Sequence, residues 1–224
     1  MIITIDGPVA SGKSTVAQLL AKKLGFYYLY TGFLYRGIAY VLATQYGYDE
    51  VSLTHVKPDD VDSIVHKHRF EYRYDQKGPQ IFFEGVDITG ALKSKDVDNW
   101  SSLISAMPFV RHAVFEYQVR IGQKYDVVAE GRDMATVVFP QAEYKFFLTA
   151  SDDVRAKRWQ QMQAQRGEHY AYEESLKAIR ERDQRDAGRA HSPLMQAPDA
   201  TLIDNSAMDI DQTVQAIERY IKKV

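Results

Sequence analysis

Residues 7–14 read GPVASGKS. It matches the phosphate-loop pattern of a glycine, four residues and then Gly-Lys-Ser. The apolar run at 1–6 predicts a short buried strand before it, and apolar residues at helical spacing follow it from 16 to 24. A strand, a glycine-rich turn and a helix are the context that the pattern requires. The sequence therefore predicts binding of a nucleoside triphosphate.

The residue types of this loop suit a polyphosphate. Gly7 and Gly12 let the backbone turn tightly, so that its N–H groups can face phosphate oxygens. The helix that follows adds its positive end. Lys13 is expected to reach the outer phosphates, and the hydroxyl of Ser14 is expected to ligate Mg²⁺. The loop alone does not identify the acceptor of the phosphoryl group.

Length, charge and cysteine content exclude several classes of protein. The 224 residues are 45% hydrophobic and 26% charged, which is ordinary for a globular protein of one or two domains. A net charge of −2 argues against a dedicated nucleic-acid binder, and the lack of cysteine excludes disulfides and thiolate metal sites. No stretch approaches the ~20 apolar residues of a membrane span, and no signal-type segment opens the chain. We expect a cytoplasmic enzyme without nucleic-acid or membrane partners.

Strands and helices alternate along most of the chain. This alternation predicts an α/β fold of three layers, with a five-stranded parallel sheet between helices. The predicted strands after the first are at 26–30, 126–129, 144–148 and 201–203. The predicted helices after the first are at 31–46, 95–106, 108–124, 152–166, 172–186 and 210–223.

The pattern changes between residues 63 and 93, where aromatic and charged residues alternate at strand spacing. We therefore predict a small antiparallel sheet inserted into the main fold. The predicted parts of this sheet are a strand at 70–74, a turn at 77–79, and strands at 81–83 and 86–88. A helix is predicted around 58–68, before the first of these strands.

A second anionic substrate would need cations of its own, and arginines are placed to supply them. Arginine is always charged and can bind phosphate through two parallel hydrogen bonds. The run 181–189, ERDQRDAGR, ends in small residues, as a mobile lid helix does. A solvated helical face with i,i+4 ion pairs explains this run equally well from spacing alone. The arginines that the inferred topology would let converge are Arg36, Arg132, Arg182, Arg185 and Arg189.

Longer strings of sequence point to a family. They are IDGPVASGKST at 5–15, TGFLYR at 31–36, EGRDMATVVFP at 130–140, ERDQRDAGRAHSPL at 181–194 and DATLIDNS at 199–206. Together they resemble the bacterial cytidylate kinases, which belong to the nucleoside monophosphate kinases of the P-loop type. The resemblance runs nearly from end to end. The inserted sheet also resembles the extra monophosphate-binding segment of that family.

The resemblance implies a reaction and a domain plan. The reaction would be Mg²⁺-dependent transfer of the γ-phosphoryl group of ATP, as co-substrate, to CMP or dCMP, giving ADP and CDP or dCDP. The chain would be a single kinase unit and a monomer. Its core would comprise 1–30, 103–155 and 195–224, with a monophosphate-binding segment at 31–102 and a short helical lid at 156–194.

Residue roles carry over by position within that resemblance. The residues expected at ATP are Gly7, Pro8, Val9, Ala10, Ser11, Gly12, Lys13, Ser14, Thr15 and Arg158. The residues expected at CMP are Thr31, Arg36, Ser102, Arg111, Arg132, Asp133, Arg182, Asp186 and Arg189. Lys13, Arg132, Arg182 and Arg189 are expected to act in catalysis, and Ser14 to hold the metal. No general base is needed, because the acceptor is already an anionic phosphate oxygen.

Selection of the base is assigned to one arginine and one carboxylate. Cytosine presents acceptors at O2 and N3 and a donor at its amino group, which Arg111 and Asp133 would match. Uracil would place a carbonyl against the carboxylate and an N–H against the guanidinium, so it is disfavoured. From spacing alone, Ser102 and Arg111 would be residues of a helix surface.

Three departures from the family pattern and two alternative functions stay open. At one of the three positions, Thr31 keeps the hydroxyl where Ser is also common. Tyr30 stands where an Asp precedes the TG or SG pair, and Ala135 stands where Gly is usual. If residue 135 requires a positive φ, alanine would be strained there. One alternative is a kinase of another acceptor, such as UMP or a non-nucleotide alcohol. The other is a regulatory protein that binds ATP with little turnover; a GTPase switch is disfavoured because no Asn-Lys-x-Asp signature is present.

Overall fold

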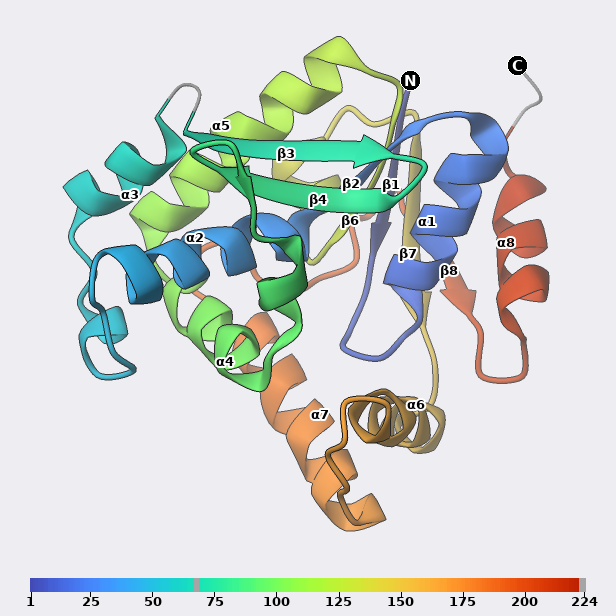
Figure 1. Ribbon diagram of the computed structural model, residues 1–224. Coiled ribbons are helices and arrows are strands. Elements are labelled where there is room, and N and C mark those ends of the chain that lie inside the picture. Colours follow the sequence, from blue (N-terminus) through green and yellow to red (C-terminus); the bar gives the residue numbers. More distant parts are fainter. Residues whose placement is uncertain (67–68, 222–224) are drawn as a thin grey trace. The chain divides into compact units, whose positions relative to one another are not determined.

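The computed structural model describes residues 1–66 and 69–221. Its elements form two compact units (Figure 1). The first unit comprises Met1–Tyr27 and Tyr125–Val224 and carries the phosphate loop. The second comprises Tyr28–Lys124 and carries the small antiparallel sheet.

The larger sheet has five strands in the order β2-β6-β1-β7-β8. β1 lies between two parallel neighbours, with Ile3 opposite Val128 on one side and Tyr144 on the other. Interior parallel strands are buried on both faces, and here β6 is buried at every residue and β1 at every residue but Ile2. The predicted α/β class with a five-stranded parallel sheet is confirmed. The strands are β1 Ile2–Asp6, β2 Tyr27–Tyr30, β6 Val127–Gly131, β7 Tyr144–Thr149 and β8 Thr201–Asp204.

Local signals begin and end the helices of the first unit. Gly25 ends α1 with φ 70°. The hydroxyl of Ser151 accepts the N–H of Val154 at the start of α6, as its sequence position predicts. α1 packs beside α8, and α6 beside α7 (Figure 1). These helices are α1 Lys13–Leu24, α6 Asp152–Ala164, α7 Tyr172–Ala187 and α8 Ile210–Glu218.

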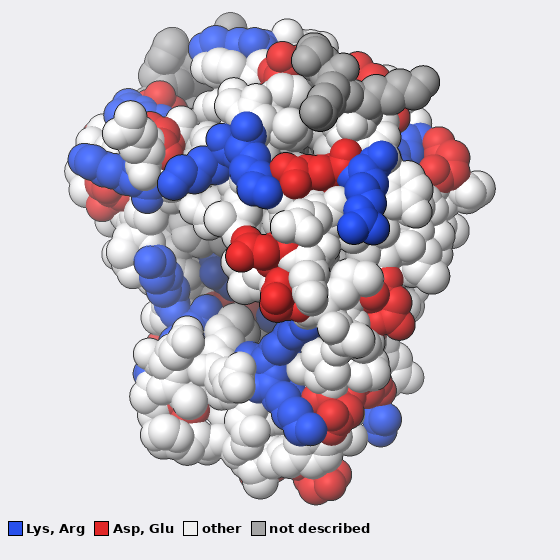
Figure 2. Space-filling model, turned by 90° about the vertical axis from the view of Figure 1, so that its right-hand side faces the viewer, with Lys and Arg blue, Asp and Glu red and all other residues white. Residues whose placement is uncertain are grey.

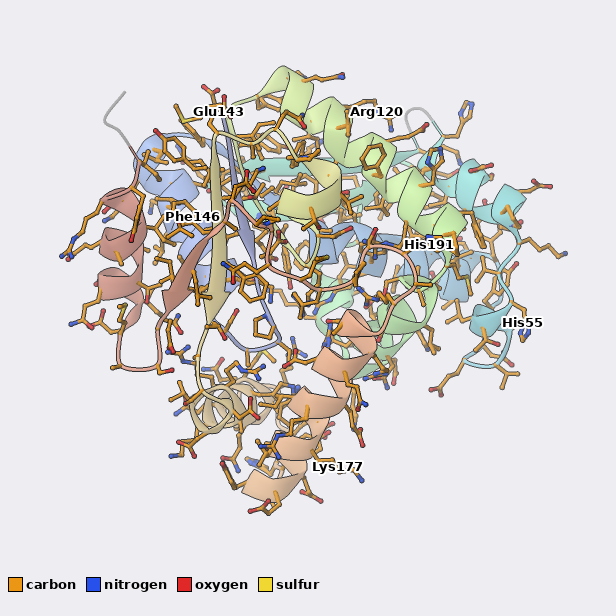
Figure 3. All side chains as sticks on the ribbon, turned by 180° about the vertical axis from the view of Figure 1, so that it is seen from behind. His55, Arg120, Glu143, Phe146, Lys177 and His191 are labelled. Carbon is orange, nitrogen blue, oxygen red and sulfur yellow. The ribbon has the colours of Figure 1, made fainter. Side chains whose placement is uncertain are left out.

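The core of the first unit fixes where its loops emerge. Ile3, Ile5, Leu20 and Phe146 are almost completely buried, and Phe146 lies on β7 (Figure 3). Burying one such side chain contributes roughly 1.5–3 kcal/mol. The phosphate loop follows the carboxyl end of β1, and residues 132–133 follow the carboxyl end of the neighbouring β6. Open parallel sheets bind their ligands at this edge.

The second unit contains the predicted antiparallel sheet, with strand order β3-β4-β5. The hydroxyl of Tyr72 donates to the carbonyl of Tyr28 (2.7 Å) and accepts the N–H of Tyr30 (2.9 Å). These bonds tie β3 to the residues that lead into α2. The strands are β3 Phe70–Asp75, β4 Gly78–Phe83 and β5 Val86–Asp87. The helices are α2 Thr31–Gln45, α3 Pro58–Val65, α4 Lys95–Ile104 and α5 Pro108–Lys124.

The turn predicted at 77–79 is wrong. The turn lies at residues 76–77, and Gly78 and Pro79 belong to β4. The carboxylate of Asp75 accepts the N–H of Lys77 (2.7 Å), so the aspartate closes the turn in place of the Gly-Pro pair. Pro79 pairs with Tyr74 in the ladder.

Other predicted ends are also corrected. The helix around 58–68 ends at Val65, because His66 is extended with ψ 149°; residue 68 lies outside the described residues. The strand at 86–88 is two residues long, and a 3₁₀ helix at Thr89–Lys93 follows it. The closing helix ends at Glu218, and residues 222–223 of the prediction lie outside the described part. Two further short helices were not predicted, a 3₁₀ helix at Ser52–Thr54 and a π-helical turn at Met134–Val138.

Charged side chains of both signs share the surface. On the face drawn in Figure 2, basic and acidic side chains are interspersed and not separated by sign. This agrees with the small net charge of −2. Over residues 1–66 and 69–221, no helix combines the length and the apolar character that crossing a bilayer requires.

Candidate active site

The phosphate loop makes a tight turn between β1 and α1. Gly7, Ala10 and Gly12 have φ values of 157°, 57° and 89°. A Cβ on Gly7 would lie 2.1 Å from the carbonyl oxygen of Leu148, so this position has no space for a side chain. A turn of this kind exposes successive N–H groups on its concave side, which is the geometry that binds phosphate.

Lys13 and Ser14 are the first two residues of α1. The ammonium of Lys13 is buried and donates to the carbonyl of Pro8 (3.0 Å). Burial, together with the charge of Arg132, lowers the pKa of Lys13 to about 7. The hydroxyl of Ser14 donates to Oε1 of Glu130 (3.1 Å). The loop thus places the amine of Lys13 next to the hydroxyl of Ser14, which is a ligand of the kind that Mg²⁺ takes.

Glu130 is a site residue that sequence reasoning missed. It is 2% exposed at the carboxyl end of β6, next to the strand that leads into the phosphate loop. Mg²⁺ takes few protein ligands and completes its octahedron with waters and phosphates. Within the described part of the chain no cluster of three or more potential metal-binding side chains exists. The hydroxyl of Ser14 and the carboxylate of Glu130 supply oxygen ligands of the kind that Mg²⁺ takes. The signal for Glu130 in the sequence was its place directly ahead of the Gly-Arg-Asp string.

One carboxylate joins two of the predicted catalytic arginines. Asp186 is 4% exposed and accepts from Nε of Arg132 (2.7 Å) and from Nη2 of Arg189 (2.5 Å). Although burial disfavours its charge, Arg132 and Arg189 lower the pKa of the Asp186 carboxyl. Arg182, one turn earlier on α7, adds its positive field at Lys13. The structure thus brings Arg132 to Asp186, which lies 54 residues later in the sequence, and Asp186 to Arg189, three residues further on.

Arg158, which the family resemblance assigns to ATP, lies against the phosphate loop. Its guanidinium donates to the carbonyl of Ser11 (3.3 Å) and to the side chain of Asn205 (2.9 Å). Asn205 in turn donates to the same carbonyl of Ser11 (3.0 Å). Asn205 is a second missed residue, and its place in the DATLIDNS string was the only signal for it.

Asp6 connects the phosphate loop to the residues after β6. Its carboxylate accepts the N–H groups of Met134 (2.9 Å) and Ala135 (2.8 Å). Ala135 does not have a positive φ, since the described non-glycine residues that do are Ala10, Glu84 and Ser192. The strain considered for alanine at this position is therefore absent. The carboxylate of Asp6 instead fixes the turn that follows Asp133.

The Asp6→Asn variant is expected to reveal a pH-dependent contribution to stability. Burial raises the pKa of Asp6 from 3.8 to about 7, and the two N–H bonds offset part of that effect. Between these values the folded state holds a proton that the unfolded state releases. The contribution of Asp6 to the free energy of unfolding is therefore full below about pH 4 and falls as the pH rises to about 7.

Urea unfolding of both proteins between about pH 4.5 and 8 measures this contribution. The difference in unfolding free energy between wild type and Asp6→Asn should fall by on the order of 1 kcal/mol per pH unit up to about pH 7, and then level off. A difference that does not change with pH would contradict the raised pKa.

In the second unit, α2 presents two predicted acceptor-site residues. Thr31 is buried and its hydroxyl accepts from Nε2 of Gln118 on α5 (3.0 Å). Arg36, one turn further on, forms an ion pair with Asp98 of α4. Its guanidinium also lies 5.8 Å from the ring centre of Tyr30. Tyr30 therefore supports Arg36 through a cation–π contact.

The two remaining residues that were predicted to bind the acceptor, Ser102 and Arg111, lie near Ser105. The carbonyl of Ser105 accepts from Nη1 of Arg111 (3.2 Å), and its hydroxyl donates to the carbonyl of Ser102 (3.0 Å). The guanidinium of Arg111 lies 5.7 Å from the ring centre of Tyr35. Ser102 and Arg111 are thus linked through one residue at the junction of α4 and α5.

Known proteins match this chain over its whole length. A family model described as cytidylate kinase matches residues 3–223. The chain belongs to the cytidylate kinase family. A cytidylate kinase of Thermodesulfovibrio yellowstonii (strain ATCC 51303 / DSM 11347 / YP87) is 37% identical over 224 residues, which cover 100% of this chain and 97% of the relative. A cytidylate kinase of Streptococcus pneumoniae (strain 70585) is 40% identical over 223 residues, or 99% and 97% of the two chains.

A solved structure supports the fold independently of close sequence likeness. The crystal structure of an uncharacterized protein from Eubacterium ventriosum ATCC 27560 aligns with a TM-score of 0.55 at 16% identity. The alignment covers 99% of this chain and 98% of that one. At this identity the likeness shows the fold alone.

The positions predicted for a cytidylate kinase site fall into two groups, one in each unit. The first unit holds Asp133, which is buried, and Thr15, which is exposed on α1. The phosphate-loop residues, Arg132, Arg158, Arg182, Asp186 and Arg189 also belong to the first unit. Thr31, Arg36, Ser102 and Arg111 belong to the second.

Proposed function

We propose that the chain transfers the γ-phosphoryl group of ATP to CMP or dCMP with Mg²⁺, giving ADP and CDP or dCDP. The observation that carries this proposal is the match of the cytidylate kinase family to residues 3–223. The phosphate loop supports ATP as the donor, since it presents N–H groups, Lys13 and Ser14 at the carboxyl edge of the sheet.

The donor phosphates would be held mainly by the loop backbone and by Lys13. The ammonium of Lys13 rests on a neutral carbonyl of its own loop, so a phosphate oxygen would be a better partner for it. Ser14 and Glu130 would hold the Mg²⁺ ion. When bound, the ion neutralises charge on the phosphates of ATP and orients them. Arg158 would form one wall of the ATP site, next to Ser11.

The transferred group would be stabilised by the arginines of the first unit. Asp186 fixes Arg132 and Arg189 before any substrate is present, so little reorganisation is needed when charge develops. Arg182 would add a third cation from α7. The acceptor oxygen is already ionised, and catalysis consists of positioning and charge neutralisation.

We assign residues 31–102 to acceptor binding and 156–194 to a lid. Thr31 and Arg36 would bind the acceptor phosphate, with Tyr30 and Asp98 supporting the guanidinium. Ser102 and Arg111, with Asp133, would bind cytidine. The residue types match cytosine and oppose uracil, as the donor and acceptor positions of the two bases require.

An assay of ADP release with Mg-ATP and a panel of acceptors tests the proposal. We expect turnover with CMP and dCMP. The kcat/KM for UMP should be at least about a hundredfold lower than that for CMP, because uracil would leave the polar groups of Arg111 and Asp133 unpaired. AMP, GMP and shikimate serve as controls and should give no turnover above ATP hydrolysis. Preferred turnover with UMP or an alcohol would identify a kinase of another acceptor. Binding of ATP without turnover on any acceptor would favour a regulatory protein.

The Asp133→Ala variant in the same assay is the control for base selection. Because Asp133 is assigned to the amino group of cytosine, its loss should lower kcat/KM for CMP and leave the KM for ATP near that of wild type. An equal loss for both substrates would show that the carboxylate does not select the base.

A further inference from the structure

Both backbone groups of one phosphate-loop residue are bound by side chains from outside the loop. The N–H of Val9 donates to Oδ1 of Asp183 on α7 (2.9 Å). The carbonyl of Val9 accepts from Nη1 of Arg155 on α6 (3.1 Å). Asp183 and Arg155 also pair directly with each other. Three residues from three elements therefore form a closed ring of polar contacts.

Arg155 has no freedom to serve as a solvent-exposed cation. Its side chain is 8% exposed. Besides Val9 and Asp183, it donates to the carbonyl of Ala150 (3.1 Å) and to Oδ1 of Asp152 (2.5 Å). A guanidinium with this many partners is held in a single position. Arg155 is thus a fixed anchor between the loop and α7.

Apolar contacts add to the same junction. The side chain of Val9 is 6% exposed and packs with Ala156 of α6 and Ile179 of α7. Trp159 and Leu176 pack against this cluster. Moving α7 away from the loop would therefore expose apolar surface as well as separate a buried ion pair, and both changes are unfavourable.

Asp183 lies next to the functional arginines of α7. Arg182 precedes it directly, and Asp186, which holds Arg132 and Arg189, follows within one turn of the same helix. A helix is stiff over one turn, so a contact that fixes Asp183 also fixes its neighbours. The position of these charges relative to Lys13 therefore depends on the contact between Val9 and Asp183.

We propose that Asp183 and Arg155 are positioning residues that latch α7 to the phosphate loop, so that nucleotide bound in the loop sets the position of Arg182 and Arg189. The proposal rests on the proposed function for its effect on turnover. In this proposal, α7 stays in contact with the phosphate loop through Asp183.

The Asp183→Asn variant tests the latch in steady-state kinetics. It keeps an oxygen for the N–H of Val9 but removes the charge that pairs with Arg155. We expect kcat to fall about tenfold to a hundredfold, because small displacements of transition-state groups have effects of this size. The KM for ATP should rise, and the KM for CMP should change less than twofold. A purely structural role would lower the melting temperature and leave these constants unchanged.

Arg180→Gln is the matched control. Arg180 lies on the same helix and pairs with Asp152 through Nε and Oδ2 (2.8 Å), but its side chain is 61% exposed. Its loss should leave kcat and both KM values within twofold of wild type. Asp183→Glu covers the case in which Asp183→Asn does not fold. It keeps the charge but lengthens the side chain, so kcat should fall while the melting temperature stays close to that of wild type; a wild-type kcat would overturn the proposal.

Hydrogen exchange separates the latch from the assignment of the acceptor. Addition of Mg-ADP to the wild type should slow amide exchange in the phosphate loop and in residues 179–186 of α7. In Asp183→Asn, Mg-ADP should protect the loop and no longer protect α7. Equal protection of α7 in both proteins would overturn the latch. This result does not depend on turnover of CMP, so failure of the proposed function would appear in the acceptor assay alone.

Discussion

Lys13→Met is expected to lower kcat about a thousandfold or more, because it removes the cation that neutralises the transferring phosphate. The folded protein should nevertheless be at least as stable. Lys13 is 6% exposed, and burial with Arg132 nearby lowers its pKa to about 7, so its charge is unfavourable in the absence of nucleotide. Methionine keeps much of the apolar stem and removes that charge.

The measurement is kcat with saturating Mg-ATP and CMP, together with the melting temperature. Lys177→Met is the matched control, since Lys177 lies on the exposed side of α7 with a side chain that is 77% exposed (Figure 3). That variant should retain wild-type turnover. Near-normal turnover of Lys13→Met would refute the assignment of the phosphate loop. A large fall in its melting temperature would show that the buried ammonium stabilises the fold.

The parts of the fold that depend on local pattern were predictable. The phosphate loop, the alternation of strands with helices and the Ser151 cap each have a sequence signal within a few residues of the structure that they specify. The turn at 76–77 was mispredicted because Gly78 and Pro79 form a strong turn signal, whereas the carboxylate of Asp75 makes the turn. Side-chain hydrogen bonds of this kind compete with the Gly and Pro signals and are not apparent from composition.

The missed residues share a property that no local pattern reveals. Asp6, Glu130, Asn205 and Asp183 are polar partners of residues more than 100 positions away in sequence: Asp6 reaches Met134 across 128 residues, and Asn205 reaches Ser11 across 194. Their role depends on which loops the parallel sheet brings together. Spacing along the chain gives no information on such pairs, whereas the arginines could be listed because phosphate chemistry requires them.

At Tyr30, which departs from the residue expected by resemblance, the structure shows the contacts that hold the side chain. Its ring lies tilted by 33° against that of Phe33 (centroids 4.5 Å apart), and its centre is 5.8 Å from the guanidinium of Arg36. A Cβ on Gly32 would meet this ring at 2.7 Å, so the glycine leaves space for the tyrosine. The tyrosine is thus accommodated by its neighbours, and the carboxylate that contacts Arg36 comes from Asp98.

Gly7→Ala should disrupt the fold and nucleotide binding together. The added Cβ would lie 2.1 Å from the carbonyl oxygen and 3.1 Å from the carbonyl carbon of Leu148, both backbone atoms of β7. β7 pairs with β1 on one side and β8 on the other, so it cannot move away without breaking ladder hydrogen bonds. Backbone strain and lost pairing together are expected to lower the free energy of unfolding by on the order of 4 kcal/mol.

Urea unfolding and calorimetric titration with Mg-ADP measure the two effects, with Gly90→Ala as the matched control. A Cβ on Gly90 meets no atom within 4 Å, so this variant should stay within about 0.5 kcal/mol of wild type and bind Mg-ADP normally. The comparison with Lys13→Met is informative, because that variant should lose chemistry and keep the fold. If Gly7→Ala instead folds with wild-type stability and binds Mg-ADP, the end of β1 is free to shift from Leu148. The tight turn would then not be required for phosphate binding.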